Sequence, residues 1–190
     1  PYIQQDKEKL AICYNKLGVI NYSKKSPNYS LAKYYIGKAI ILSHSFDNNY
    51  VASDIFYSLS ELDKMTGSYI QAIKAMHHSI GMCEDNIQKC NSYTIIGEAY
   101  YLLNKDDSAR SYLKKSLPSC LLDFRAKAFR LLQSIADRNR DKVNFDYYTR
   151  RYIECSDSLK EEESKQTKII SRIKDIMNNK TIDEYKSTNL

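Results

Sequence analysis

The 190-residue chain contains no tryptophan, only five glycines, three prolines and three histidines, and no CxxC pair. So few glycines and prolines argue against a β protein, which needs a turn after every short strand. Five cysteines without a CxxC pair fit neither a zinc-binding pattern nor a complete disulfide framework. The sequence has no signal peptide, and no apolar run approaches the roughly 20 residues that a membrane-spanning helix needs. We therefore expect an all-α protein, with no membrane insertion by this part of the chain.

The composition is that of an ordinary soluble globular protein, with 43% apolar and 27% charged residues. A chain of this length forms one domain most simply. Its net charge of +6 is spread along the sequence, whereas a nucleic-acid-binding surface usually gathers its basic residues on one face. The densest pairs, Lys24-Lys25 and Arg150-Arg151, fit solvated helix surfaces. We expect no direct nucleic-acid binding.

Residue types that carry chemistry are sparse. His77 and His78 are adjacent and point in different directions on a helix, whereas helical metal ligands need a spacing of four residues. His44 stands alone, and the acidic run Glu161–Glu163 fits a solvated helix surface. The chain has no glycine-rich phosphate loop, nucleophile elbow or recognisable Cys/His pair. We expect no enzyme activity, no metal and no cofactor.

The clearest pattern lies in residues 91–116. Four residues there are spaced to share one helix face: Tyr93, Ile96, Gly97 and Tyr100. Glycine costs about 1 kcal/mol in a helix relative to alanine, so Gly97 indicates the close approach of a second helix. Residues 104–106 form the expected turn, and Ala109 is the small residue that the second helix places opposite Gly97. This spacing predicts an antiparallel helix pair.

The same arrangement occurs four times along the chain. The small residue of the second helix falls at Ala32, Ala72, Ala109 and Asn144, at intervals of 35 to 40 residues. The turn position, five residues earlier, holds Gly67, Asn104 and Asn139 in the last three copies. Glycine and asparagine tolerate a left-handed backbone better than other residues. We predict four antiparallel helix pairs, forming a helical repeat domain over residues 1–156.

This pattern resembles the tetratricopeptide (TPR) repeat, a helix-turn-helix unit of roughly 34 residues. In the third copy, Tyr93, Ile96, Gly97 and Tyr100 occupy the slots of W-x2-L-G-x2-Y. Ala109 and Leu113 occupy those of A-x3-F. The resemblance covers residues 10–155 and implies an α-solenoid. No tryptophan opens a repeat, and His44, Glu84 and Leu121 hold the slots where proline closes one.

The segment DYYTRRYIECSDSLKEEESKQ, residues 146–166, is similar to the last repeat of the TPR input regions of Bacteroidetes-type regulators. In those proteins a charged helix leads to a membrane helix, a coiled coil and an output domain. The chain begins at Pro1 rather than methionine, so we expect it to be part of a longer protein. The resemblance implies the periplasmic side of the inner membrane, whereas free cysteines favour a reducing compartment such as the cytoplasm. The compartment stays open.

After residue 156 the composition becomes highly charged, and apolar residues then recur at helical spacing: Ile169, Ile170, Ile173, Ile176 and Met177. We expect one helix over residues 157–178 that begins by capping the last repeat, within a connecting segment 157–190 whose residues 181–190 are frayed. Its apolar end either packs on the repeats or mediates self-association.

Three of the cysteines follow the repeat register. Cys83, Cys120 and Cys155 each lie 11 residues after the small-residue position, where the first copy has Ser43. A free cysteine packs as a small hydrophobe, so we expect these three thiols to be reduced and buried. Cys83 and Cys90 flank one loop between repeats and could instead form a bond.

TPR stacks are curved, and their first helices line a concave groove. The resemblance implies ten groove-facing positions for a peptide or protein partner: Asn15, Tyr22, Tyr57, Glu61, Lys64, Thr94, Glu98, Tyr101, Phe129 and Gln133. Aromatic residues among polar ones suit an extended peptide or a partner helix. Asn15 and Val19 stand where a TPR carboxylate clamp has lysine and asparagine, which disfavours a receptor for chaperone tails.

Together these features favour a non-enzymatic protein- or peptide-binding module, the sensory or regulatory region of a larger transcriptional or signalling regulator. A stand-alone assembly scaffold is the alternative among binding proteins. A helical enzyme or phosphatase-like regulator is the alternative from another class. It is disfavoured because no catalytic constellation can be placed.

Overall fold

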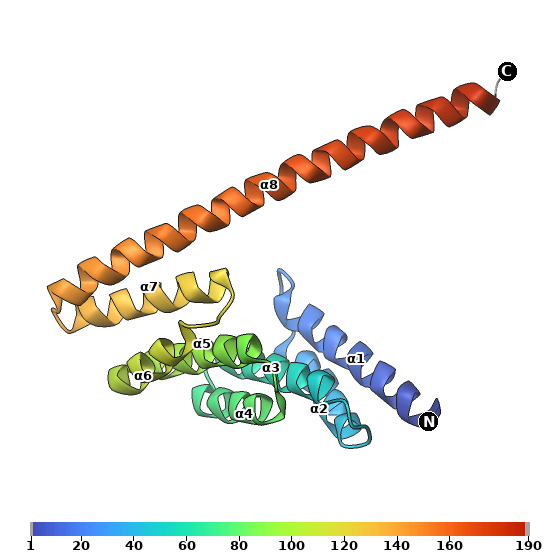
Figure 1. Ribbon diagram of the computed structural model, residues 1–190. Coiled ribbons are helices and arrows are strands. Elements are labelled where there is room, and N and C mark those ends of the chain that lie inside the picture. Colours follow the sequence, from blue (N-terminus) through green and yellow to red (C-terminus); the bar gives the residue numbers. More distant parts are fainter. Residues whose placement is uncertain (1, 189–190) are drawn as a thin grey trace.

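The computed structural model describes residues 2–188, and the side chains of residues 4–177. This part of the chain is all-α, without a strand, and its eight helices are α1 (Tyr2–Ser23), α2 (Tyr29–Ser43), α3 (Asn49–Met65), α4 (Tyr69–Met82), α5 (Asn86–Leu102), α6 (Asp106–Ser116), α7 (Leu122–Arg138) and α8 (Lys142–Thr188). Consecutive helices pack as the pairs α1–α2, α3–α4, α5–α6 and α7–α8, and each pair packs on the next (Figure 1). The predicted all-α, solenoid-like fold with a long C-terminal helix is confirmed.

The turns inside the last three pairs share one geometry. After each first helix, one backbone N–H donates to the carbonyl five residues earlier: Ser68 to Asp63 at 2.7 Å, Lys105 to Tyr100 at 2.9 Å and Asp141 to Ala136 at 2.8 Å. The residue just before each donor has a positive φ: 77° at Gly67, 55° at Asn104 and 56° at Arg140. A left-handed residue with this bond is a common way to satisfy the last carbonyls of a helix.

Two of the three predicted turn residues, Gly67 and Asn104, are confirmed. The prediction of Asn139 is wrong, because its φ is −87° and Arg140 takes the left-handed conformation instead. Asn139 donates its side-chain amide to the carbonyl of Ile135 and to the carboxylate of Asp106. The turn therefore comes one residue later in the fourth pair than the sequence register indicates.

Two glycines mark close helix crossings. A Cβ atom added at Gly97 would lie 2.6 Å from Cγ of Leu113 on α6, and one added at Gly18 would lie 2.5 Å from Cγ1 of Ile36 on α2. Both distances are shorter than van der Waals contact. The expected close approach at Gly97 is confirmed, but the nearest atoms of α6 belong to Leu113 rather than to Ala109, the predicted partner, which is fully buried in the same pair.

The prediction that the three cysteines at the repeated position are buried is confirmed. Cys83, Cys120 and Cys155 are 7%, 4% and 7% exposed, and their thiols are free. Cys83 and Cys90 are not bonded to each other in the structure. The thiol of Cys83 lies 2.6 Å from Oε1 of Gln88 instead.

The fourth pair departs from the predicted register at its second helix. Asn144, expected to face inward, is exposed. Its backbone N–H and its side-chain amide both donate to the carboxylate of Asp141, at 3.1 and 2.6 Å, which caps the start of α8. Phe145 and Tyr148 pack against the core in its place.

Helix α8 runs without a break through the expected boundary at residues 156 and 157, and beyond residue 178 to Thr188. Cys155 and Leu159 are its last contributions to the core, and residues 160–177 are all exposed. Figure 1 shows this second half of α8 extending away from the other helices. The expectation that the apolar end packs on the repeats is wrong for the described side chains, and self-association stays a prediction. The expectation that residues 181–190 are frayed is wrong for residues 181–188, which continue α8, and residues 189–190 lie outside the described residues.

Within the described residues, no helix is both long enough and apolar enough to cross a membrane.

Candidate functional site

A hollow of about 140 Å³ lies where helices from three successive pairs meet. Its lining consists of Tyr57 and Glu61 from α3, Ile95 from α5, and Asp123, Phe124 and Lys127 from α7. These three helices are the first members of their pairs, the helices that were expected to line the groove. Because three pairs supply its walls, the hollow exists only when the pairs are stacked.

Helical spacing explains why these side chains meet. Tyr57 and Glu61 are four residues apart and share one face of α3, as Asp123 and Lys127 do on α7. Ile95 on α5 is 1% exposed and belongs to the core beneath. The rings of Tyr57 and Phe124 pack against the same core cluster, which limits their movement.

A chain of alternating charges runs along one side of the hollow. Nζ of Lys64 donates to Oε1 of Glu61 at 2.7 Å and to Oε2 of Glu98 at 2.5 Å. Nζ of Lys127 donates to the same Glu98 oxygen at 2.8 Å. The four side chains tie α3, α5 and α7 together, and three of them, Glu61, Lys64 and Glu98, are at most 20% exposed.

The ion pairs keep these buried groups charged. Burial by itself raises the pKa of Glu98, but Lys64 and Lys127 outweigh burial and hold the pKa below its ordinary value. Burial by itself lowers the pKa of Lys64, but Glu61 and Glu98 leave it above its ordinary value. Both groups are therefore ionised at neutral pH, and each already has a partner of opposite charge.

Two tyrosines on the same face have hydroxyls that resist ionisation. Burial, followed by the charge of Glu61, raises the pKa of Tyr22 to about 12. Burial also raises the pKa of Tyr57, and the charges that raise it further are those of Glu61, Tyr22, Asp123 and Asp54. Both hydroxyls stay protonated at neutral pH and can donate hydrogen bonds.

A polar contact joins α1 to α3 next to these tyrosines. Nδ2 of Asn15 donates to Oδ2 of Asp54 at 2.9 Å, and Asn15 is only 3% exposed. Desolvation raises the pKa of Asp54, and the hydrogen bond from Asn15 opposes that shift. Asn15 therefore positions Asp54, and its burial leaves little surface for a ligand.

The ten groove positions implied by the TPR resemblance separate into groups. Tyr57 and Glu61 line the hollow, and Lys64 and Glu98 form the charge chain beside it. Asn15, Tyr22, Tyr101 and Gln133 contact other helices. Gln133 donates to Oγ1 of Thr149 on α8 at 2.7 Å, and the ring of Tyr101 lies 4.6 Å beneath the guanidinium of Arg138.

Four of the ten positions need correction because they are buried rather than on an open surface: Asn15, Tyr22, Thr94 and Phe129 are 3%, 8%, 0% and 3% exposed. Thr94 is 0% exposed, and its hydroxyl donates to the carbonyl of Cys90 at 3.4 Å. Phe129 is 3% exposed and packs beside Tyr148 of α8, with 6.4 Å between ring centroids. Phe129 is buried because α8 covers the face of α7 that the repeat register assigned to the groove.

Four residues of the hollow were missed by the sequence reasoning: Ile95, Asp123, Phe124 and Lys127. The repeat register assigned Phe129 and Gln133 on α7 to the positions that correspond to the groove positions of α5. Both residues contact α8 instead. One signal was present in the sequence, because Asp123 and Lys127 are two charges four residues apart on a first helix. No local sequence pattern indicates that Asp123 and Lys127 line the same hollow as Tyr57, which belongs to a pair two repeats earlier.

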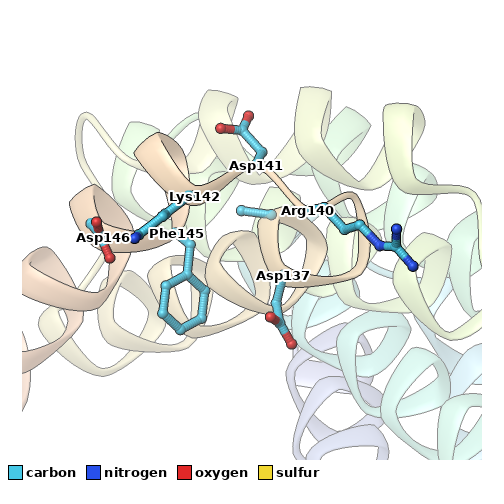
Figure 2. Close-up of a pocket in the computed structure, with 7 residues that line it drawn as sticks. Asp137, Arg140, Asp141, Lys142, Phe145 and Asp146 are labelled. Atoms are coloured by element: carbon cyan, nitrogen blue, oxygen red, sulfur yellow. The ribbon is translucent and has the colours of Figure 1, made fainter.

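A second hollow, of about 300 Å³, lies at the turn between α7 and α8. Its lining includes Asp137, Arg140, Asp141, Lys142 and Phe145. Figure 2 shows its charged side chains pointing in different directions rather than toward a common point. Asp141 is already occupied in capping α8, so this hollow is a weaker candidate than the one between the first helices.

Among the described residues, no group of three or more His, Cys, Asp or Glu side chains is placed to hold a metal ion. A comparison of the chain with models of known protein families gives no match, and a comparison with curated proteins gives no significant match. The hollow between α3, α5 and α7 offers two aromatic rings, an apolar floor and charged groups, which together are suited to holding a side chain.

Proposed function

We propose that the chain is a TPR-type binding module without catalytic activity, and that its first helices bind an extended peptide or a partner helix. The observation that carries the proposal is the hollow in which Tyr57 and Phe124 lie next to carboxylates from two repeats. Aromatic anchors among polar groups are the typical composition of binding hot spots.

The charge chain supports this function by holding the walls in place. Lys64 and Lys127 both bond to Glu98, so α3 and α7 are fixed relative to α5 before any ligand arrives. A site that is already ordered loses less conformational entropy on binding. This arrangement favours recognition of a partner by a rigid surface.

We also propose that the module is the sensory or regulatory region of a larger regulator. Two features support this role: the similarity of residues 146–166 to regulator input regions, and the unbroken course of α8 out of the repeats (Figure 1). The complete gene tests it. A membrane helix followed by a DNA-binding or kinase motif downstream supports the regulator, and a gene without any output domain favours the assembly scaffold.

Binding is tested by probing an array of immobilised peptides with the purified chain. Tyr57→Ala removes a wall of the hollow, and Tyr34→Ala removes a tyrosine that is 57% exposed on α2. Truncating a hot-spot residue costs about 2 kcal/mol or more, so we expect capture by Tyr57→Ala to fall more than about tenfold. Tyr34→Ala should capture peptides as the parent chain does.

Melting is measured for each variant alongside capture. If Tyr57→Ala melts at a lower temperature, Tyr57→Phe retains the packed ring and tests the hydroxyl alone. Full capture by a folded Tyr57→Ala chain would place the binding surface elsewhere.

A further inference from the structure

The charges of the hollow are not balanced once its internal ion pairs are taken into account. Lys127, the lining cation, is bound to Glu98, and Glu61 is bound to Lys64. The remaining lining charge, Asp123, is exposed and has no ion-pair partner among the described residues. The charge left available to a ligand is therefore negative.

A second carboxylate on the same face has only a neutral hydrogen-bond donor. Asp54 accepts its hydrogen bond from the amide of Asn15, and Lys16 acts on it only through its charge. Asp54 and Asp123 both act electrostatically on Tyr57, from α3 and α7 respectively. Carboxylates from two different repeats thus act on Tyr57, and neither forms an ion pair among the described residues.

The uncharged part of the lining also suits a cation. The faces of Tyr57 and Phe124 carry the negative side of the ring quadrupole, which attracts a lysine ammonium or an arginine guanidinium. Ile95 supplies an apolar surface for the methylene stem of such a side chain. Long basic side chains bury their stems on apolar surface and leave their charged ends among polar groups.

The size of the hollow limits what can enter it. A volume of about 140 Å³ would hold about five water molecules at the volume each occupies in the liquid. That is room for one side chain and too little for a helix. The hollow therefore suits a single residue of a bound peptide, the rest of which would lie on the surrounding surface.

We infer that the hollow between α3, α5 and α7 is a specificity pocket for one lysine or arginine side chain of the bound peptide, with Asp123 as its ion-pair partner. The inference rests on the proposed peptide-binding function and names the chemistry of the ligand. An acidic side chain at this place would meet Asp123 and Glu61, while Lys127 is already bound to Glu98. Like charges brought together at an interface oppose binding.

The test is a nonapeptide array in which one position is fixed as each amino acid in turn and the others are randomised, probed with the purified chain. We expect fixed lysine or arginine to give the strongest capture. A hydrogen bond to a charged group contributes enough that Asp123→Asn should weaken capture of these peptides about tenfold. Asp123→Lys should move the preference to fixed aspartate or glutamate.

Asp107→Asn is the matched control. Asp107, like Asp123, lies in the first turn of its helix and is exposed, but it pairs with Arg110 at 3.5 Å, belongs to α6 and does not line the hollow. It should leave capture unchanged. The chain has a net charge of +6, which disfavours basic peptides at long range, so a preference for them cannot come from the overall charge.

The two proposals fail in different ways. If the parent chain captures no peptide, the proposed peptide-binding function is overturned and the inference falls with it. If peptides are captured without a basic preference, or if Asp123→Asn and Asp107→Asn weaken capture equally, the specificity pocket is overturned and the binding function stands.

Discussion

The repeats and the second half of α8 are both helical, but different interactions stabilise the helices in the two regions. Ile135 on α7 is 0% exposed, whereas Ile173 on α8 is 50% exposed. In the repeats each helix buries its apolar stripe against neighbours. Beyond Leu159, the described side chains of α8, up to residue 177, contribute nothing more to the core. The comparison shows that a helical pattern in the sequence does not by itself indicate which helix is packed.

The second half of α8 relies on local interactions. Lys165 bonds to Glu161 at 2.8 Å, and Lys160 lies 3.5 Å from Asp157, each pair within one turn. Such pairs stabilise a helix by about 0.2–0.5 kcal/mol each, and lysine and glutamate are good helix formers. These contributions are small beside the burial of one large side chain, about 1.5–3 kcal/mol.

The largest difference should come from one substitution made in both regions. Ile135→Ala leaves a cavity in the core and should lower the free energy of unfolding by about 2–5 kcal/mol. Ile173→Ala removes an exposed side chain and should change it by less than about 0.5 kcal/mol. Urea unfolding followed by circular dichroism measures both. Equal losses would mean that the second half of α8 is packed in solution.

Substituting two glycines tests whether close helix contact or intrinsic helix propensity determines the change in stability within the repeats. Gly97→Ala should lower stability by about 1–3 kcal/mol, because the new methyl group would overlap Leu113. Gly37→Ala on α2 meets nothing within 4 Å and should raise stability by about 0.5–1 kcal/mol through propensity. Thermal melts of the two variants should shift in opposite directions. A stabilising Gly97→Ala would show that the α5–α6 crossing is looser than the structure has it.

A glutamate pair compares an ion pair inside the stack with one on α8. Glu98→Gln should cost about 1–2 kcal/mol at pH 7, since both Lys64 and Lys127 lose a charged acceptor. Glu161→Gln, on the exposed part of α8, should leave global unfolding unchanged.

The stabilisation by the ion pairs of Glu98 should depend on pH, and the direction of its pKa shift gives the sign. The folded pKa of Glu98 lies below its ordinary value of 4.5, so its ion pairs stabilise the fold above about pH 4.5. The contribution is lost as the pH falls through the folded pKa. The difference between the parent chain and Glu98→Gln should therefore shrink in acid. A difference that is constant from pH 7 to pH 3 would contradict the assigned pKa direction.

A serine pair gives the smallest expected effect. Ser60 on α3 is 0% exposed, and its hydroxyl has no hydrogen-bond partner among the described residues. Ser60→Ala removes this unpaired group and should raise stability by about 1 kcal/mol. Ser171→Ala, on the exposed part of α8, should leave the melting temperature unchanged. A destabilised Ser60→Ala chain would show that the hydroxyl has a partner in solution.

The sequence alone determined most of the helices, their pairing and two of the three predicted turn positions. These features follow from contacts within about 35 to 40 residues, and such contacts leave a periodic trace: Gly97 opposite Leu113, Ala109 in the core, Gly67 and Asn104 in left-handed turns. The same reasoning placed Tyr57 and Glu61 on the face of α3 that borders the hollow. Buried cysteines at one repeated position were predictable for the same reason.

Only the tertiary structure decided which side chains complete the hollow. Asp123 and Phe124 line the same hollow as Tyr57 because the stacking of three pairs brings α3, α5 and α7 together there. Phe129 and Gln133 were placed wrongly in the groove because α8, as one unbroken helix, packs on that side of α7. The exposure of Ile169, Ile173 and Ile176 was likewise undecided by sequence, since an isoleucine stripe specifies an apolar face but not the surface that covers it.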